Sequence, residues 1–132
     1  YPKLRSYALN AYLGWTGMWD GRLSSSYAVF QRYNRISTKM PLGTFLFMDV
    51  QPDSICWPYF GVQMQTDTFF NFPGTSHSRG TIISYSDSHV DWHRWLDART
   101  LNPNSPNYHA HNDASPGNVD IAWMRARTTV LK

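Results

Sequence analysis

The chain has 132 residues, enough for one domain with a modest hydrophobic core, and we expect residues 1–132 to form a single globular domain. Aromatic and charged residues each make up 16% of the chain, a balance that favours strands and turns over helices. The net charge is +3, and the twelve Lys and Arg are scattered rather than clustered, which argues against a nucleic-acid partner. No run of 18 apolar residues is present, so the sequence predicts no membrane-spanning segment.

The first fifty residues predict short elements separated by Gly and Ser. Alternation around Tyr7 and Leu9 favours a strand, although a 3.6-residue period over residues 4–11 also fits a short helix. Residues 27–33 fit either a short strand or a single helical turn, and residues 36–41 are expected to be a connector. Residues 44–50 (TFLFMDV) form a short, continuous apolar run, which is typical of a buried strand.

The next segment begins with a turn at residues 51–54, where Pro and Asp favour chain reversal. Residues 57–64 predict another strand, and Pro58 places its start at a sheet edge because proline cannot donate a ladder hydrogen bond. The single cysteine, Cys56, cannot form an internal disulfide. We interpret it as a small buried hydrophobic residue rather than as a reactive thiol.

The strongest pattern is a β-hairpin within residues 72–95, FPGTSHSRGTIISYSDSHVDWHRW. The first strand, residues 79–86, is rich in Thr, Ile and Tyr, and a two-residue polar turn separates it from a second strand at residues 89–95. Along the second strand apolar and polar residues alternate, which predicts one apolar and one polar face. The apolar residues are Val90 and Trp92, and the polar residues are His89, Asp91 and His93.

The remaining chain predicts a loop and a helix. Residues 101–118 are dominated by Asn, Pro and Ser, and a loop of this length in a compact domain is typical of a functional or poorly ordered segment. A short helix is predicted over residues 120–127. Asn118 is its candidate N-cap, and Asp120 would lie in the first turn, where a negative charge is favourable.

Two sets of side chains are candidate metal sites. Asp87, His89, Asp91 and His93 share one predicted strand face, but neighbours on such a face lie about 6.5–7 Å apart, so we favour a solvated hairpin face. The second set is His109, His111 and Asp113, whose H-x-H spacing is a weak metal signal and whose oxygen-rich surroundings suit calcium better. We expect no cofactor, with calcium in this loop as the alternative.

Catalytic motifs give no support to an enzyme. The sequence has no G-x-S-x-G elbow, no S-x-x-K motif and no glycine-rich phosphate loop. We therefore predict a non-enzymatic protein. Two alternatives stay open. One is a secreted, aromatic-rich binding module for carbohydrate or a surface ligand, which would stack on Trp and Tyr, and the other is a metal-dependent hydrolase that uses the His and Asp sets.

The hairpin also carries a motif of a known family. His77 is followed by nine residues and then by Asp87, Ser88 and His89. This pattern resembles the H-x9-D-G-H-V signature near the C-terminus of type II secretion G-like pseudopilins and type IV pilin-like proteins. Further segments look similar and occur in the family's order, so the resemblance covers most of the chain. They are residues 5–12, 47–49, 52–55, 72–73, 93–95, 97–100 and 120–129.

The resemblance implies an α+β, mostly β fold: a pilin-like head with an antiparallel sheet, a C-terminal hairpin and a short helix near the C-terminus. It implies structural roles for His77 and Asp87. Asp87 would start the turn through an Asx-type hydrogen bond, and His77 would donate a hydrogen bond from the preceding loop. The family's glycine after the Asp is Ser88 here, and serine would be strained if the turn requires a positive φ.

We therefore expect the soluble head of a pseudopilin or pilin-like protein, exported to the periplasm, the cell envelope or an extracellular filament. The family's leader and long hydrophobic helix do not occur in this chain, so we expect a fragment that meets the membrane only through that helix. The expected partners are other pilin-like subunits or a second copy, bound through an apolar sheet face. Otherwise the head would cover that face with its own loops, since large exposed apolar patches are uncommon in stable monomers.

Overall fold

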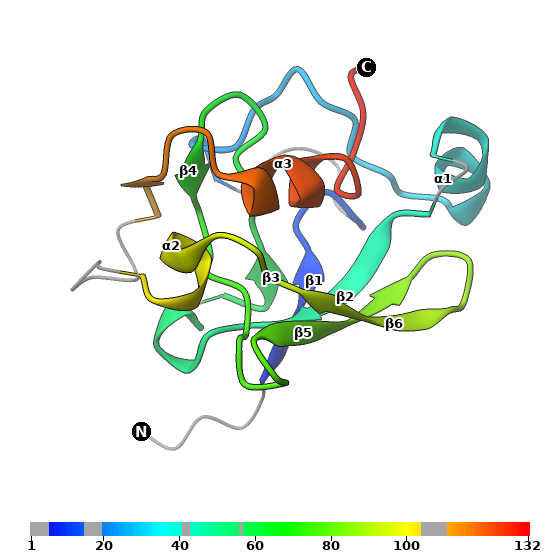
Figure 1. The fold of residues 1–132 in the computed structure, drawn as a ribbon. Coiled ribbons are helices and arrows are strands. Elements are labelled where there is room, and N and C mark those ends of the chain that lie inside the picture. Colours follow the sequence, from blue (N-terminus) through cyan, green and yellow to red (C-terminus); the bar gives the residue numbers. More distant parts are fainter. Residues whose placement is uncertain (1–5, 15–19, 41–42, 56, 104–110) are drawn as a thin grey trace.

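The computed structural model describes residues 6–14, 20–40, 43–55, 57–103 and 111–132, and Cys56 and His109 lie outside these ranges. The chain is α+β and mostly β, as predicted (Figure 1). Among the described residues, no helix has the length and apolar character needed to cross a membrane. In chain order the elements are β1 (Tyr7–Asn10), α1 (Tyr33–Lys39), β2 (Phe45–Asp49), the 3₁₀ turn η1 (Pro52–Ser54), β3 (Tyr59–Phe60), β4 (Thr68–Phe69), β5 (Gly80–Tyr85), β6 (Val90–Arg94), α2 (Ala98–Leu101), β7 (Asp113–Ala114) and α3 (Val119–Arg125).

A five-stranded sheet with the order β3-β1-β2-β5-β6 forms the centre of the fold, and β4 and β7 form a separate two-stranded sheet. Four strands of the larger sheet pair antiparallel, but β3 pairs with β1 in parallel. The sheet is therefore mixed, which corrects the expectation of an antiparallel sheet. The reason is that β2 runs antiparallel to β1 and the chain reverses once more before β3. The edge position of β3 agrees with Pro58 just before it.

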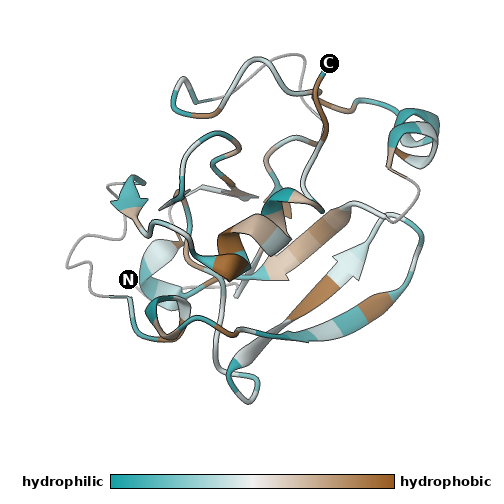
Figure 2. Cartoon of the chain, turned by 45° about the horizontal axis from the view of Figure 1, so that its top comes forward, coloured by the Kyte–Doolittle hydropathy of each residue, from teal (hydrophilic) through white to brown (hydrophobic). Residues whose placement is uncertain are grey.

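Helix α3 covers the inner face of the sheet and closes the core (Figure 2). Ile121 and Met124 of α3 are buried with Met48 of β2 and Ile83 of β5 in one hydrophobic cluster. The helix begins close to the predicted position, and the side chain of Asn118 accepts a hydrogen bond from the Asp120 backbone N–H at 2.9 Å. The predicted N-cap and first-turn acid are thus confirmed.

Two expectations for irregular segments are wrong. The connector expected at residues 36–41 belongs largely to α1, because Ile36 and Met40, four residues apart, are buried against Leu13 and Phe30. The loop expected at residues 101–118 contains β7, which pairs with β4. Both elements depend on distant partners that local sequence does not reveal.

Candidate functional site

The predicted hairpin is formed by β5 and β6, and its second strand, β6, turns its apolar residues away from the core. Ile82 pairs with Trp92 and Ser84 pairs with Val90, so these four residues share the face opposite α3, which we call the outer face. Val90 and Trp92 are 65% and 44% exposed. The alternation is as predicted, but its apolar side faces solvent.

His93 lies on the opposite, inner face of β6. Its ring stacks on Trp123 of α3 with ring centroids 3.5 Å apart, and Arg127 lies over the same indole. The prediction of a solvated polar face is therefore wrong for His93, because α3 supplies an aromatic surface on that side. Burial lowers the pKa of His93 below its ordinary value of 6.5, so the ring is neutral at neutral pH.

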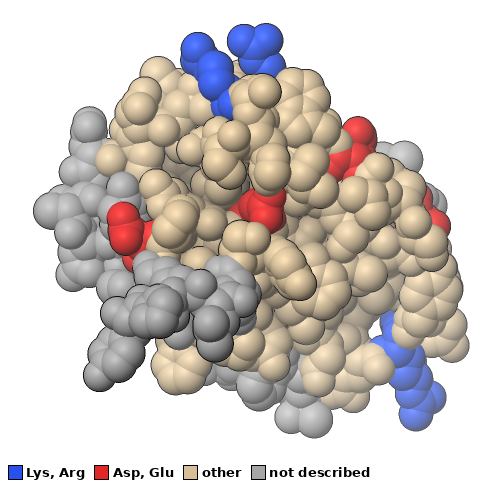
Figure 3. Space-filling view, turned by 90° about the horizontal axis from the view of Figure 1, so that it is seen from below, with Lys and Arg blue, Asp and Glu red and all other residues tan. Residues whose placement is uncertain are grey.

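A groove runs over the outer face between β1 and β6. It has a volume of about 410 Å³, and Tyr7, Phe47, Asp49, Ile82, Ser84 and Val90 line it. We call it the outer groove. The rings of Tyr7 and Phe47 meet edge to face with centroids 6.0 Å apart. Figure 3 views the molecule from the side opposite α3 and shows a mainly uncharged surface with one acidic group near its centre.

The groove depends on Phe47, which the sequence predicts to be buried. The run at residues 44–50 is apolar at almost every position, which is typical of a strand covered on both faces. In the structure Met48 is fully buried on the inner face, whereas Phe47 is 43% exposed on the outer face. A strand with two apolar faces but one covering layer leaves an apolar surface exposed.

His77 lies at the rim of the outer groove and joins three segments. Its Nε2 lies 2.9 Å from Oδ2 of Asp49, a groove residue on β2. Its backbone carbonyl accepts a hydrogen bond from Trp92 Nε1 at 2.7 Å. The histidine of the H-x9-D motif thus ties the loop before β5 to both β2 and β6. A structural role for His77 stays a prediction, and this geometry fits it.

Asp87, Ser88 and His89 lie at the tip of the hairpin. The Ser88 N–H donates to the Tyr85 carbonyl at 3.1 Å, and the Tyr85 N–H donates to the His89 carbonyl at 2.9 Å. The connection therefore has three residues, 86–88, rather than the predicted two. Asp87 Oδ1 accepts from the His89 N–H at 3.3 Å, an Asx-type bond, and also contacts the His89 ring. Ser88 has φ +76°, the conformation in which serine was expected to be strained.

We expect Ser88→Gly to raise the free energy of unfolding by about 1 kcal/mol, because a left-handed conformation costs a non-glycine residue more than it costs glycine. Urea denaturation of both proteins measures the change. Ser25→Gly is the matched control, since Ser25 is also exposed and has no positive φ. It should be neutral or slightly destabilising. Destabilisation by Ser88→Gly would contradict the account of strain at this turn.

The predicted metal residues of the C-terminal loop are placed as follows. His111 is buried, its Nδ1 lies 2.6 Å from the Phe70 carbonyl oxygen, and its ring stacks on Phe70 at 4.4 Å. Asp113 lies on β7 opposite Phe69. Within the ranges that the structure describes, no three His, Cys or Asp side chains form a group that could hold a metal ion. Calcium in this loop stays a prediction.

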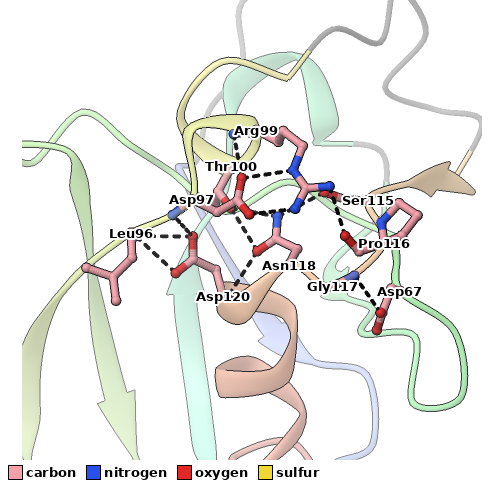
Figure 4. Close-up of polar contacts among 10 residues, drawn as sticks. All are labelled: Asp67, Leu96, Asp97, Arg99, Thr100, Ser115, Pro116, Gly117, Asn118 and Asp120. Carbon is pink, nitrogen blue, oxygen red and sulfur yellow. Dashed lines mark hydrogen bonds and ion pairs between the residues drawn. The ribbon is translucent and has the colours of Figure 1, made fainter.

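Sequence reasoning missed a polar cluster that holds the start of α3 (Figure 4). We call it the α3 anchor; its side chains are Asp67, Asp97, Arg99, Thr100, Ser115, Asn118 and Asp120. Asp120 is 1% exposed and accepts from the backbone N–H groups of Leu96 and Asp97, at 3.0 and 2.9 Å. The N-cap pattern was the only local signal for this cluster.

The carboxylates of the α3 anchor are satisfied by the protein itself. Hydrogen bonds from Arg99 lower the pKa of Asp97, and a hydrogen bond from the Gly117 N–H, followed by one from Arg125, lowers the pKa of Asp67. Because Arg99 also donates to the Pro116 carbonyl at 3.0 Å, a guanidinium already occupies the place that a cation would take. The cluster is therefore a structural anchor.

The outer groove is thus the main surface of the described residues that the core does not explain. His77 stands at its rim, whereas Asp87, Ser88 and His89 form the hairpin tip, so the structure does not gather the motif residues into one reactive centre. Comparison with known proteins adds no relative: no protein-family model, no curated protein and no solved structure matches the chain.

Proposed function

We propose that the chain is a non-enzymatic structural subunit: the globular head of an exported pseudopilin or pilin-like protein of a secretion or filament system. The observation that carries this proposal is the apolar outer groove on an otherwise folded sheet. A pilin-like head needs such a face, because its sheet packs against an apolar helix. The H-x9-D motif and the hairpin that contains it support the same function.

The exposed side chains of the outer face are too many to be incidental. Single exposed apolar residues are normal on soluble proteins, but contiguous patches mark surfaces that bind something. Five large apolar side chains lie on these strands with exposures between 39% and 65%: Tyr7, Phe47, Ile82, Val90 and Trp92. No segment of the described residues covers them, so the alternative in which the head's own loops bury this face does not hold for that part of the chain.

An apolar helix is a suitable occupant of the groove. Asp49 is the only acid among the described residues of the groove lining, and its carboxylate already has a polar partner in the His77 ring. A partner that covers the groove would therefore not bury a carboxylate that lacks a polar contact, which would be costly. Each apolar side chain that becomes covered contributes on the order of 1 kcal/mol. We expect the helix of a pilin-like subunit in the assembly, and a second copy of the chain when that helix is missing.

The chain by itself is expected to self-associate, and Val90→Asp should weaken the association by at least about tenfold, because a carboxylate in the interface would lose its hydration. Sedimentation equilibrium over a concentration series measures the effect. Val119→Asp is the matched control: Val119 is 54% exposed at the start of α3, where a negative charge is favourable. A wild-type monomer at millimolar concentration would contradict the role of the groove, as would equal effects of the two substitutions.

Location in the cell tests the filament role itself. Antibodies against the chain should label filaments or the envelope of the source cell, and the chain should occur in sheared filament preparations. A chain confined to the cell interior would exclude this role even if the groove mediates self-association. Sedimentation therefore tests the role of the apolar surface, and location in the cell tests the role in a filament.

Exposed aromatic side chains favour one second candidate, a carbohydrate-binding module. Tyr7, Trp57 and Trp92 are 55%, 54% and 44% exposed, and such rings can stack on sugars. The Trp92 indole is held by its hydrogen bond to the His77 carbonyl. A saturable change in tryptophan fluorescence on glycan addition, lost in Trp92→Ala, would place this candidate ahead of the filament subunit.

A further inference from the structure

A second cavity, away from the outer groove, lies beside α1. Its volume is about 400 Å³, and it is lined by residues 28–32 together with Arg35 and Lys39. We call it the basic cavity. Arg32 directly precedes the helix, and Arg35 and Lys39 follow at spacings of three and four residues, so the three cations lie along one side of α1.

Among the described residues, the three cations have no carboxylate partner. All nine acidic residues of the chain are Asp, and all nine lie in the described residues. Elsewhere, Arg22, Arg99 and Arg125 pair with Asp side chains at 2.6 to 2.8 Å. In the part of the chain that the structure describes, no such pair involves a cation of the basic cavity, and all three are exposed. Their charge is therefore available to a ligand.

The other wall of the cavity is an extended segment that contributes a backbone donor. The N–H groups of Ala28 and Phe30 donate to the carbonyls of Val130 and Tyr12, both at 2.8 Å. Successive N–H groups of an extended chain point in opposite directions. The N–H of Val29, which lies between Ala28 and Phe30, therefore points away from these two partners. Val29 lines the cavity, and its N–H has no hydrogen-bond partner among the described residues. A backbone N–H and three cations thus border one open space.

We propose that the basic cavity binds a multivalent oxyanion, such as a phosphate ester or a diphosphate. Arginine guanidinium groups match the oxygen geometry of phosphate, and a lysine adds a point charge. Three positive charges match a ligand with two or three negative charges more closely than they match a single carboxylate. The cavity also has room for more than one phosphate group. The site lies on different elements from the outer groove and does not depend on the filament role.

Pyrophosphate titration at low ionic strength tests the site, with binding followed by calorimetry and by backbone NMR shifts. We expect saturable binding with the largest shifts at residues 28–39. Joint replacement of Arg32, Arg35 and Lys39 by Ala should weaken it by at least about tenfold. Arg94→Ala is the control, since Arg94 is an exposed arginine on β6 that likewise has no acidic partner in the described chain. It should change affinity by less than about twofold.

Binding to vesicles distinguishes two sources of such an anion, a lipid headgroup and a soluble phosphate compound. Co-sedimentation with phosphatidylcholine vesicles that contain phosphatidylglycerol, lost in the triple variant, would identify a lipid headgroup. Pyrophosphate binding without co-sedimentation would identify a soluble phosphate compound, and both results support the site. Absence of both kinds of binding would overturn the proposal. So would a loss per removed charge that is as large in Arg94→Ala as in the triple variant, because binding would then follow net charge alone.

Discussion

Asp120→Ala is expected to lower the free energy of unfolding by about 3 kcal/mol, because it leaves buried backbone donors without acceptors. The Asp120 carboxylate accepts from the Leu96 and Asp97 N–H groups, and the residue is 1% exposed. Alanine cannot accept these bonds, and water does not reach the site easily. The start of α3 would also separate from the segment after β6, which the carboxylate now joins.

Urea denaturation followed by circular dichroism measures this loss, and two further variants make the result specific. Asp120→Asn keeps an acceptor oxygen and should lose about half as much free energy of unfolding. Asp91→Ala removes an exposed carboxylate from β6 and should change that free energy by less than about 0.5 kcal/mol. If all three proteins unfolded at the same urea concentration, the α3 anchor would have no stabilising role.

Asn10→Ala is expected to cost a similar amount, about 3 kcal/mol, because Asn10 joins three separate parts of the chain. Its Nδ2 donates to the carbonyls of Phe45 at 3.1 Å and Thr128 at 2.9 Å, and its Oδ1 accepts from the Tyr12 N–H at 3.0 Å. Asn10 is completely buried. Its loss would leave two carbonyls and one N–H without partners, in a place where water cannot replace the amide.

Asn10→Asp separates the hydrogen bonds from simple loss of volume. The carboxylate keeps the acceptor for Tyr12 but directs an oxygen at two carbonyl oxygens, so we expect Asn10→Asp to be at least as destabilising as Asn10→Ala. Thermal unfolding of both variants, measured side by side, makes the comparison. A stable Asn10→Asp protein would mean that the amide donor contributes little.

The elements that could be predicted from the sequence are those with local signals. The hairpin was recognisable because two β-prone runs flank a short polar turn, and the start of α3 because Asn118 and Asp120 form a capping pattern. The strain at Ser88 also followed from local reasoning, since glycine is the residue that tolerates positive φ. In each case the information lies within a few residues of the feature.

The features that escaped prediction depend on distant partners. Helix α1 forms where Ile36 and Met40 meet Leu13 and Phe30, and the direction of β3 depends on how the chain returns to β1. The outer groove escaped for a related reason. The continuous apolar run of β2 is typical of a strand covered on both faces, but only one face is covered, so the exposure of Phe47 could be known only from the layers around β2.

The long-range bonds between the chain's two ends also constrain when the protein can fold during synthesis. The Phe45 N–H donates to the Arg127 carbonyl, the Lys132 N–H donates to the Ser26 carbonyl, and Asn10 reaches Thr128. While the ribosome still holds the C-terminal residues in its exit tunnel, the first strands lack these partners and the core cannot close. The domain can therefore complete its fold only after residues 127–132 have emerged from the tunnel.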